Sequence, residues 1–481
     1  MKVFAGDFIY RDDNGSPIPS LTVSRTCGRD GPIVLEDTAL IQNLAHFATE
    51  RISERVVHAR GGGAYGDFIV THDITRYTKA AVFSKIGLKT PIIVRFSTVA
   101  GEKGSPDVSR NPRGFAIKFY TTVGIWDIVG NNTPIFFLRD PMLFPAMVHS
   151  QKLNPKTGRP VINDNNMMWD FNTLRHETLF QNMRAMSDLG TPDGWRYMDG
   201  FGSHTFVLVN ANDYPVYCKF HWLTNQGVRN LTAAEATRIA GENPDYSAQD
   251  LYDAIEAGDY PSWNFFIQVM TFEQADKFKY SVHDLTKIWP EDEYPLIPVG
   301  KLELNRNPEN FFHEIEQLAF CPSHMIPGIE PSRDRMLVAR MMNYKASQRH
   351  RLGPNFMQIP VNCPLNRPTN IYRDGLMNMW NQGSSVNYFP NSFSLYRPDI
   401  GADFINYTAS GPVARYDTGD DDNYTQPREW YDSLSAYDQD ALAANIAGSL
   451  KGVKESIQKR VVEAHSIISQ KLGDAIASAI K

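Results

Sequence analysis

Short runs of β-branched and aromatic residues, spaced as in successive hairpins, place the strongest constraint on the fold of this chain. Four such runs lie at residues 67–71, 91–96, 114–120 and 133–138, and three more follow at 204–209, 216–222 and 263–271. Residues of these types favour strands because they pack well on a pleated surface. Two groups of strands at hairpin spacing favour one antiparallel β-barrel over two separate sheets.

Helical signals surround these strands. Thr232 is a predicted N-cap for a helix over residues 233–257, and apolar residues recur with helical spacing from Leu442 to Ile467. Residues 305–422 are rich in Pro, Asn and Arg, but their aromatic content argues against disorder. We therefore expect an α+β protein with an N-terminal arm (1–50), a barrel region (51–304), a wrapping segment (305–422) and a C-terminal helical domain (423–481).

The composition excludes several classes of function. The 481 residues are 42% apolar and 21% charged, which suffices for a large core. A net charge of −6 leaves no basic surplus for nucleic acid or an anionic membrane. No apolar window reaches the roughly 18 residues that a spanning helix needs. We expect neither nucleic acid nor a membrane as a partner.

The cysteines and the two ends of the chain bear on its compartment. The four cysteines lie far apart and lack the close spacing of zinc or iron–sulfur sites, so we expect reduced thiols. Charged residues from Asp7 onward interrupt the start, so we expect a protein that is not secreted. The last residues differ from the S-K-L type of peroxisomal signal, which leaves both the cytoplasm and the peroxisome open.

Two stretches carry residues suited to chemistry. His58 precedes three glycines at 61–63, where the backbone can approach something large and flat. Arg340 and Tyr344 lie four residues apart in a predicted helix that begins near residues 331–335, so they share a face, and the guanidinium could hold the phenol ionised. Each stretch alone also has a structural explanation, namely a hydrogen-bonded histidine and an arginine packed on a tyrosine ring.

Together with further motifs, these stretches resemble the monofunctional haem catalases of the small-subunit type. The resemblance runs from about Gly31 to the C-terminal helices. Its motifs are R-V-V-H-A (55–59), V-R-F-S-T-V-A-G-E (94–102), N-P-R-G-F-A (111–116), V-G-N-N-T-P-I-F-F (129–137), D-G-F-G-S-H-T-F (199–206), Y-P-L-I-P-V-G (294–300) and R-H-R-L-G-P-N (349–355). The resemblance implies the haem-catalase fold, which is an antiparallel eight-stranded β-barrel with a long wrapping segment and a C-terminal helical domain. It also implies a haem cofactor, expected to be haem b, and a homotetramer.

The resemblance also implies roles for single residues. His58 would be the acid/base, Asn131 would orient peroxide, and Ser97 would fix the tautomer of His58. Tyr344 would be the axial ligand of the haem iron. The other implied residues would contact the haem (Arg55, Val57, Arg95, Phe136, Phe144, Arg340 and Arg351) or line the substrate channel (Val99 and Asn111).

Several positions depart from the family pattern. Asn111 stands where the family has an aspartate that is thought to orient peroxide in the channel. Around Tyr344, the residues that replace the usual Phe, Pro and Asp are Met342, Lys345 and Ala346. At positions that match the family's NADPH site, basic residues are replaced by Phe180, Leu189, Leu223 and Glu291. We therefore expect NADPH to bind weakly or not at all.

We predict an enzyme, a haem oxidoreductase that decomposes hydrogen peroxide to water and dioxygen. One alternative is an oxidoreductase of the same fold that acts on an organic molecule in specialised metabolism, by a chanoclavine-synthase-like oxidative cyclisation or an allene-oxide-synthase-like reaction. A third hypothesis, a non-catalytic haem-binding protein, conflicts with the retained acid/base residues. Oxygen evolution from dilute peroxide discriminates between these hypotheses.

Overall fold

The computed structural model describes residues 9–160, 164–366, 368–380, 382–394 and 396–480. The chain divides into two compact units, residues 1–54 and 55–481. In the first unit, helix α1 (Thr38–Phe47) begins at Asp37, whose carboxylate accepts a hydrogen bond from the backbone N–H of Leu40. Every candidate site residue belongs to the second unit.

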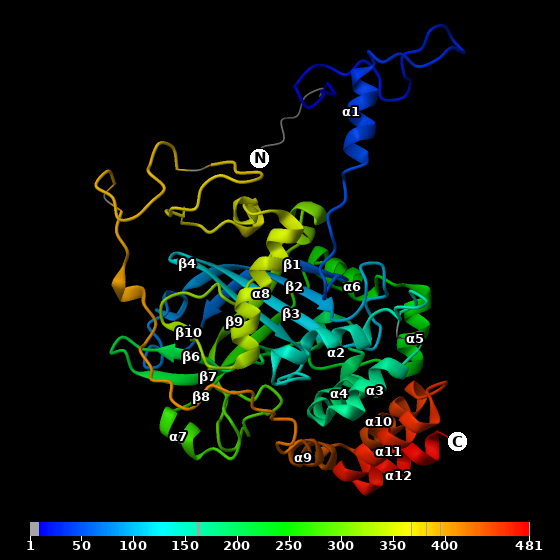
Figure 1. Ribbon diagram of the computed structural model, residues 1–481, viewed down its shortest axis with the longest axis vertical. Coiled ribbons are helices and arrows are strands. Elements are labelled where there is room, and N and C mark those ends of the chain that lie inside the picture. The colour runs from blue at the N-terminus through cyan, green and yellow to red at the C-terminus, as the bar shows by residue number, and fades with distance from the viewer. Residues whose placement is uncertain (1–8, 161–163, 367, 381, 395, 481) are drawn as a thin grey trace. The chain divides into compact units, whose positions relative to one another are not determined.

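An antiparallel β-barrel forms the centre of the second unit (Figure 1). Among the described residues, eight strands pair in a closed ring in the order β1, β2, β3, β4, β5, β7, β8, β9. These strands are β1 (Gly61–Val70), β2 (Lys89–Thr98), β3 (Arg113–Thr121), β4 (Gly124–Asn131), β5 (Gly200–Phe201), β7 (Pro215–Thr224), β8 (Ser262–Met270) and β9 (Ile297–Arg306). Strands β6 (Phe206–Val209) and β10 (Ile329–Pro331) extend the sheet beyond β7. The predicted eight-stranded barrel is confirmed.

The run at residues 133–138 is not a strand, so that prediction was wrong. Strand β4 ends at Asn131, and the following residues form bends. Phe137 and Leu138 pack instead with Met147 of helix α2 (Phe144–Gln151) in a separate apolar cluster. Burial against a helix therefore explains the apolar character of this run, which periodicity alone cannot distinguish from sheet pairing.

Aromatic rings fill the interior of the barrel. Along β1, buried residues alternate with half-buried ones, as expected where one face of a strand packs on a core. The ring of Phe68 lies edge-on to Phe119 and Phe265, with centroids 5.5 and 5.6 Å away, and Trp126 joins the same cluster. Rings packed at these distances leave no room for a large cofactor, so the functional site must lie outside the barrel.

Helices cover the barrel on several sides. The predicted helix at residues 233–257 is confirmed as a pair, α5 (Ala233–Glu242) and α6 (Tyr246–Glu256), and Thr232 caps α5 in a capping box. Pro244 separates the two helices because it disfavours helical conformation before it. The other helices of this region are α3 (Asn166–Leu174), α4 (Leu179–Met186), α7 (Phe272–Lys277) and α8 (Arg335–Leu352).

The predicted C-terminal helical region is confirmed. Its described helices are α9 (Thr425–Ser433), α10 (Ala436–Ser449), α11 (Glu455–Ile468) and α12 (Gln470–Ala479). They share an apolar cluster with residues of α3 and α4, beside which they lie in Figure 1. In the described ranges, every helix is too short or too polar to cross a bilayer.

Candidate active site

Neighbouring strands align small and polar residues in one row. Gly61 of β1 pairs with Ser97 of β2. Ser97 in turn pairs with Gly114 of β3, and Gly114 pairs with Asn131 of β4. Side chains at directly paired positions project to the same face of a sheet. Ser97 and Asn131 therefore share a face, with a glycine between them.

His58 lies over this row and is held by both its ring and its backbone. Its Nδ1 atom is 2.9 Å from Ser97 Oγ, and its backbone N–H donates to the carbonyl of Val99 at 2.9 Å. Its carbonyl accepts a hydrogen bond from Arg95 Nη1 at 2.8 Å. The φ angle of His58 is 60°, in the left-handed region, which costs energy for a residue with a side chain. These contacts hold the backbone of His58 in a conformation that a free chain disfavours, and they fix the position of its imidazole ring.

The imidazole of His58 is neutral at physiological pH. Burial first, and then the positive charges of Arg95 and Arg340, lower the pKa of His58 to about 3. When Nδ1 is protonated and donates to Ser97, Nε2 keeps its lone pair. A buried neutral imidazole of this kind can accept a proton at one stage of a reaction and return it at another.

Asn111 is connected to His58 through Val99. The Oδ1 atom of Asn111 accepts hydrogen bonds from the backbone N–H groups of Val99, at 2.8 Å, and Ala100, at 3.2 Å. The carbonyl of the same Val99 accepts the N–H of His58. Asn111 therefore positions the loop that carries one of the supports of His58. An aspartate at this position could accept the same two hydrogen bonds.

On helix α8, Arg340 and Tyr344 form the pair that their spacing predicts. Arg340 Nη2 donates to the Tyr344 hydroxyl at 2.7 Å and to the carbonyl of Val129 at 3.0 Å. Val129 lies on β4, two residues before Asn131. The contact of Arg340 with β4, and the influence of its charge on His58, place α8 and the His58 row around one site.

Two residues of this site were not predicted from the sequence. His204 Nε2 lies 2.6 Å from Arg340 Nη1, and His204 Nδ1 lies 2.6 Å from the carboxylate of Asp334. Asp334 also caps α8, since its other oxygen accepts the backbone N–H groups of Met336 and Leu337. His204 stands in one of the matched motifs, at 199–206, which was the available signal. The result is a chain of polar groups that runs from the buried Asp334 and His204 to the half-buried Arg340 and Tyr344.

The departures near Tyr344 lie on the exposed side of α8. Met342 is 71% exposed, and Lys345 and Ala346 are also exposed. Met342, Val338 and Ala339 line a surface cavity of about 850 Å³. These substitutions therefore leave the contact between Arg340 and Tyr344 in place.

Three buried arginines gather around one turn of the wrapping segment. Arg55 and Arg351 both donate to backbone carbonyls of residues 315–318. Burial lowers the pKa of Arg55 to about 10 and that of Arg351 to about 9, and it also lowers the pKa of Arg95. The carboxylate of Glu316, 4.0 Å from Arg55 Nη1, offsets only part of this charge. Within the described residues, Arg55 Nη1 and Arg95 Nε are buried without a hydrogen-bond partner.

The remaining predicted residues lie around this region. Phe136 and Phe144 stack with ring centroids 6.2 Å apart. Asn131 is buried and uses one amide N–H to contact the carbonyl of Arg113 at 3.2 Å, which leaves its other N–H for a ligand. Val57 is half-buried beside His58 in the chain. No cluster of His, Cys, Asp and Glu suited to a metal ion is present in the described part of the chain.

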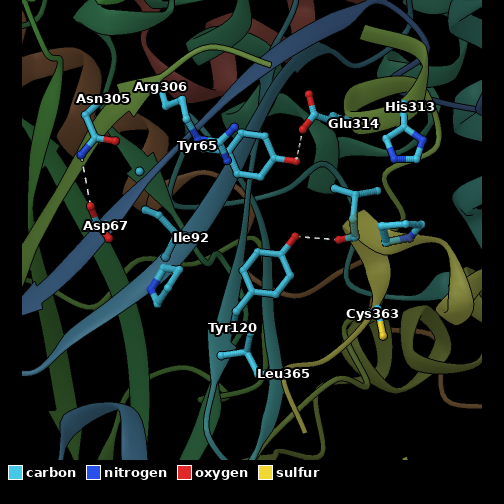
Figure 2. Close-up of a pocket in the computed structure, with 14 residues that line it drawn as sticks. Tyr65, Asp67, Ile92, Tyr120, Asn305, Arg306, His313, Glu314, Cys363 and Leu365 are labelled. Atoms are coloured by element: carbon cyan, nitrogen blue, oxygen red, sulfur yellow. Dashed lines mark hydrogen bonds between the residues drawn. The ribbon is translucent and has the colours of Figure 1, made fainter. Parts of the chain in front are cut away.

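A separate cavity of about 440 Å³ lies at Tyr65 and Tyr120 (Figure 2). Figure 2 shows the Tyr65 hydroxyl pointing to Glu314, to which it donates at 3.1 Å. Tyr120 donates to the carbonyl of Val361 at 2.6 Å. The lining of this cavity contains none of the predicted site residues, so the cavity is distinct from the site of His58 and Tyr344.

Comparisons with known proteins agree with this geometry. The sequence model of a family described as Catalase matches residues 11–395, and one described as Catalase-related immune-responsive matches residues 418–480. The chain is 55% identical to a catalase of Glandirana rugosa over 465 residues, which covers 96% of this chain and 88% of that protein. The chain belongs to the catalase family. A catalase of Ascaris suum is 52% identical to this catalase-family protein over 479 residues, 98% of this chain and 88% of that one.

Solved catalases have the same fold as this family member. A fungal catalase superposes with a TM-score of 0.96 at 41% identity, covering 100% of this chain and 98% of that chain. Catalase A from Saccharomyces cerevisiae gives 0.95 at 44% identity, covering 98% and 99%. This catalase-family protein is thus an oxidoreductase that uses haem and decomposes hydrogen peroxide. The organic-substrate alternative is not favoured, because relatives at this level of identity are catalases.

The residues present fit a haem. Haem carries two carboxylates, and the buried unpartnered nitrogens of Arg55 and Arg95 offer donors for them. Their addition would balance the positive charge that burial otherwise penalises at these arginines. The hydroxyl of Tyr344 could supply an oxygen ligand to the iron. The donor set of this catalase-family protein therefore suits a flat dianionic macrocycle with iron at its centre.

Proposed function

We propose that His58, Asn131 and Tyr344 carry out the decomposition of hydrogen peroxide with a bound haem, whose iron Tyr344 would hold. The observation that carries this assignment is the neutral His58, hydrogen-bonded to Ser97 and enclosed with Asn131 beside the site of Tyr344 and Arg340. A protein that only stores haem has no need of a strained, hydrogen-bonded acid/base group.

The haem, when bound, supplies the iron that exchanges electrons with peroxide. His58 accepts a proton from one peroxide oxygen at Nε2 and returns it to the other oxygen, so that the second leaves as water. Ser97 holds the tautomer that makes this possible, because its hydroxyl accepts the hydrogen of Nδ1. The free N–H of Asn131 orients the peroxide before the proton moves.

Tyr344 would hold the haem iron through its hydroxyl oxygen. Its hydroxyl oxygen already accepts a charge-assisted hydrogen bond from Arg340 Nη2 at 2.7 Å. Arg340 is itself positioned by His204 and by the carbonyl of Val129. Arg55, Arg95 and Arg351 would hold the haem carboxylates, and Val57, Phe136 and Phe144 would contact its faces.

The cofactor would be haem b, and NADPH would bind weakly or not at all. Phe180, one of the replaced basic positions, packs 5.9 Å from the ring of Trp430, and the guanidinium of Arg184 lies over both rings. Packing thus occupies a position where the family has a basic side chain. Pyridine haemochrome spectra test the haem type, and analysis of nucleotide released from the denatured protein tests NADPH.

The assembly would be a homotetramer located in the cytoplasm or the peroxisome. Membership of the family supports the tetramer. Sedimentation velocity of the holoprotein tests the assembly, and fractionation of the source cells tests the compartment.

The decisive experiment on the assignment compares oxygen evolution from dilute peroxide by the purified holoprotein and by His58→Ala. We expect rapid evolution in the first and a severe loss in the second at equal haem content. Equal rates would reject His58 as the acid/base.

A further inference from the structure

Lys219 is a buried cation whose hydrogen bond is made to the backbone. It lies on β7 between Cys218 and Phe220, which belong to the barrel core, so its side chain projects to the outer face. It is 4% exposed, and its Nζ donates to the carbonyl of Ser203 at 2.8 Å. An ammonium group buried without an ion pair is costly, so its presence calls for a specific role.

Other buried lysines behave differently. Lys118 lies 2.8 Å from the carboxylate of Asp127, and Lys287 lies 3.4 Å from that of Asp284. Within the described residues, Lys219 has no such ion pair; its charge lies 5.4 Å from the centroid of the Trp289 ring. The carbonyl of Ser203 is therefore its main partner.

Ser203 needs a partner of this kind. Its φ angle is 60°, in the left-handed region, although it is not glycine. Its hydroxyl donates to the carbonyl of Thr133 at 3.2 Å, and its own carbonyl accepts from Lys219. These two bonds hold the backbone in a conformation that a serine disfavours.

The residue that follows Ser203 is His204, the partner of Arg340. On its other side, Ser332 donates to the carbonyl of Thr205. The segment 203–205 is thus held at both ends, by Lys219 and by Ser332. With its backbone fixed in this way, the ring of His204 lies between Asp334 and Arg340 at 2.6 Å from each.

The charge of Lys219 acts on the same groups. It contributes to the lowered pKa of Asp334 and of His204, while burial lowers the pKa of Lys219 itself to about 8. Asp334 in turn favours the charged form of Lys219. Lys219, His204, Asp334 and Arg340 therefore form one electrostatic group behind Tyr344.

We propose that Lys219 is a positioning residue of the reaction: by holding the strained Ser203 it fixes His204, and through His204 it fixes Arg340 against Tyr344. This inference rests on the proposed role of Tyr344 as haem ligand. It adds a member, on strand β7, to the chain of groups that sets the charge around that ligand.

The test replaces Lys219 by methionine in the holoprotein and measures the ferric/ferrous midpoint potential of the haem. Loss of a buried positive charge, with looser Arg340, favours the ferric state, so we expect a shift to more negative potential and a displaced phenolate charge-transfer band. Peroxide turnover should fall about tenfold, the scale of groups that orient a metal ligand. Lys219→Arg keeps the positive charge and a hydrogen-bond donor, so its midpoint potential should equal that of the wild-type protein.

The matched control is Lys287→Met, which also removes a buried lysine but has no contact with residues 203–205. We expect it to lower thermal stability without moving the potential. If Lys219→Met lowers only stability and leaves both the potential and the band at wild-type values, the proposal is overturned.

A double variant covers the case in which Lys219→Met binds too little haem. Glycine takes a φ of 60° without strain, so Ser203→Gly with Lys219→Met should recover haem binding and return the potential towards the wild-type value, except for the part of the shift that the lost charge causes. Failure of that variant to recover haem binding would contradict the inference. Tyr344→Phe, measured in parallel, separates the two proposals, because an unchanged spectrum there rejects the ligand assignment itself.

Discussion

Gly114 lies against the ring of His58: a Cβ atom at position 114 would stand 2.6 Å from His58 Nδ1 and 2.4 Å from Ser97 Oγ. Both distances are shorter than non-bonded atoms tolerate, so Gly114→Ala must displace the pair. We expect kcat/KM for peroxide to fall by about 100-fold, because catalytic groups shifted by about 1 Å lose this much. Initial rates of oxygen evolution at matched haem content measure it.

The control for this variant is Gly104→Ala. A Cβ at position 104 would meet no atom within 4 Å, so we expect wild-type activity. A fully active Gly114→Ala protein would show that the row can relax without cost to the reaction.

His58→Ala should retain haem and lose turnover. The three arginines and Tyr344 remain, whereas the proton carrier is absent, so we expect a decrease of about 10² to 10⁴ in rate, the usual scale for a positioned acid/base. Stopped-flow mixing with peroxide measures the first step directly. Ser97→Ala should have a smaller effect in the same direction, since it removes only the support of the tautomer. If the His58 variant reacts nearly as fast as the parent, another group moves the proton.

Tyr344→Phe should abolish the phenolate charge-transfer band of the ferric protein. Phenylalanine has no oxygen for the iron, while its ring keeps most of the packing of the original side chain. Absorption spectra of the purified holoprotein provide the measurement. Tyr372→Phe is the control, because Tyr372 is 81% exposed and should leave the spectrum unchanged.

Substitutions at Asn111 should separate its two roles. Asn111→Ala removes the acceptor of two backbone N–H groups, so the loop of Val99 and its bond to His58 should loosen, and we expect turnover to fall about tenfold. Asn111→Asp keeps the acceptor and adds a charge at the position proposed to line the substrate channel, which should raise oxygen evolution without changing haem content. Oxygen-electrode assays of both variants are the test. A decrease in Asn111→Asp would show that the amide hydrogens matter more than charge.

Acid should destabilise the protein through its buried neutral histidines. Burial lowers the pKa of His58 and His221 to about 3, and that of His283 and His465 to about 4. Their unfolded pKa is about 6.5, so below that pH the unfolded state binds more protons. The contribution of these histidines to the free energy of unfolding is therefore fully present above about pH 6.5 and is lost as the pH falls towards 4.

His465 offers a clean test of this dependence. It lies in α11, far in sequence from the proposed catalytic groups, and its Nδ1 donates a hydrogen bond to the carbonyl of Val461 at 2.7 Å. His465→Gln should reduce the protons taken up on unfolding at pH 5 by about one, measured by calorimetry across pH. The exposed His350→Gln is the control and should leave this number unchanged.

Local patterns predicted the elements that depend on local physics. Runs of β-branched and aromatic residues located most of the barrel strands, and helical spacing located the C-terminal helices and the pair of Arg340 and Tyr344. The run at 133–138 failed because an apolar segment buried against α2 has the same composition as one buried in a sheet. The composition of a segment therefore predicts that it is buried, but the rest of the chain decides which element it packs against.

Apart from the pair of Arg340 and Tyr344, the site was predictable only where a family motif accompanied it. His58, Ser97 and Asn131 come from three separate motifs, and the strand registers show how they meet. The contact of His204 with Asp334 joins residues 130 positions apart, and Lys219 on β7 reaches Ser203, 16 positions earlier, between β5 and β6. No periodicity or spacing in the sequence encodes such contacts, because they arise only when the barrel closes.

The carboxylate of Asp334 caps a helix and also binds a histidine of the site. One carboxylate oxygen starts helix α8, and the other binds His204, which leads to Arg340 and Tyr344. Any exchange at this position alters the helix that carries the proposed ligand Tyr344 and, at the same time, the chain of hydrogen bonds that ends on its hydroxyl. For protein engineering this means that position 334 offers no route to a more stable helix that leaves the iron's reactivity as it was.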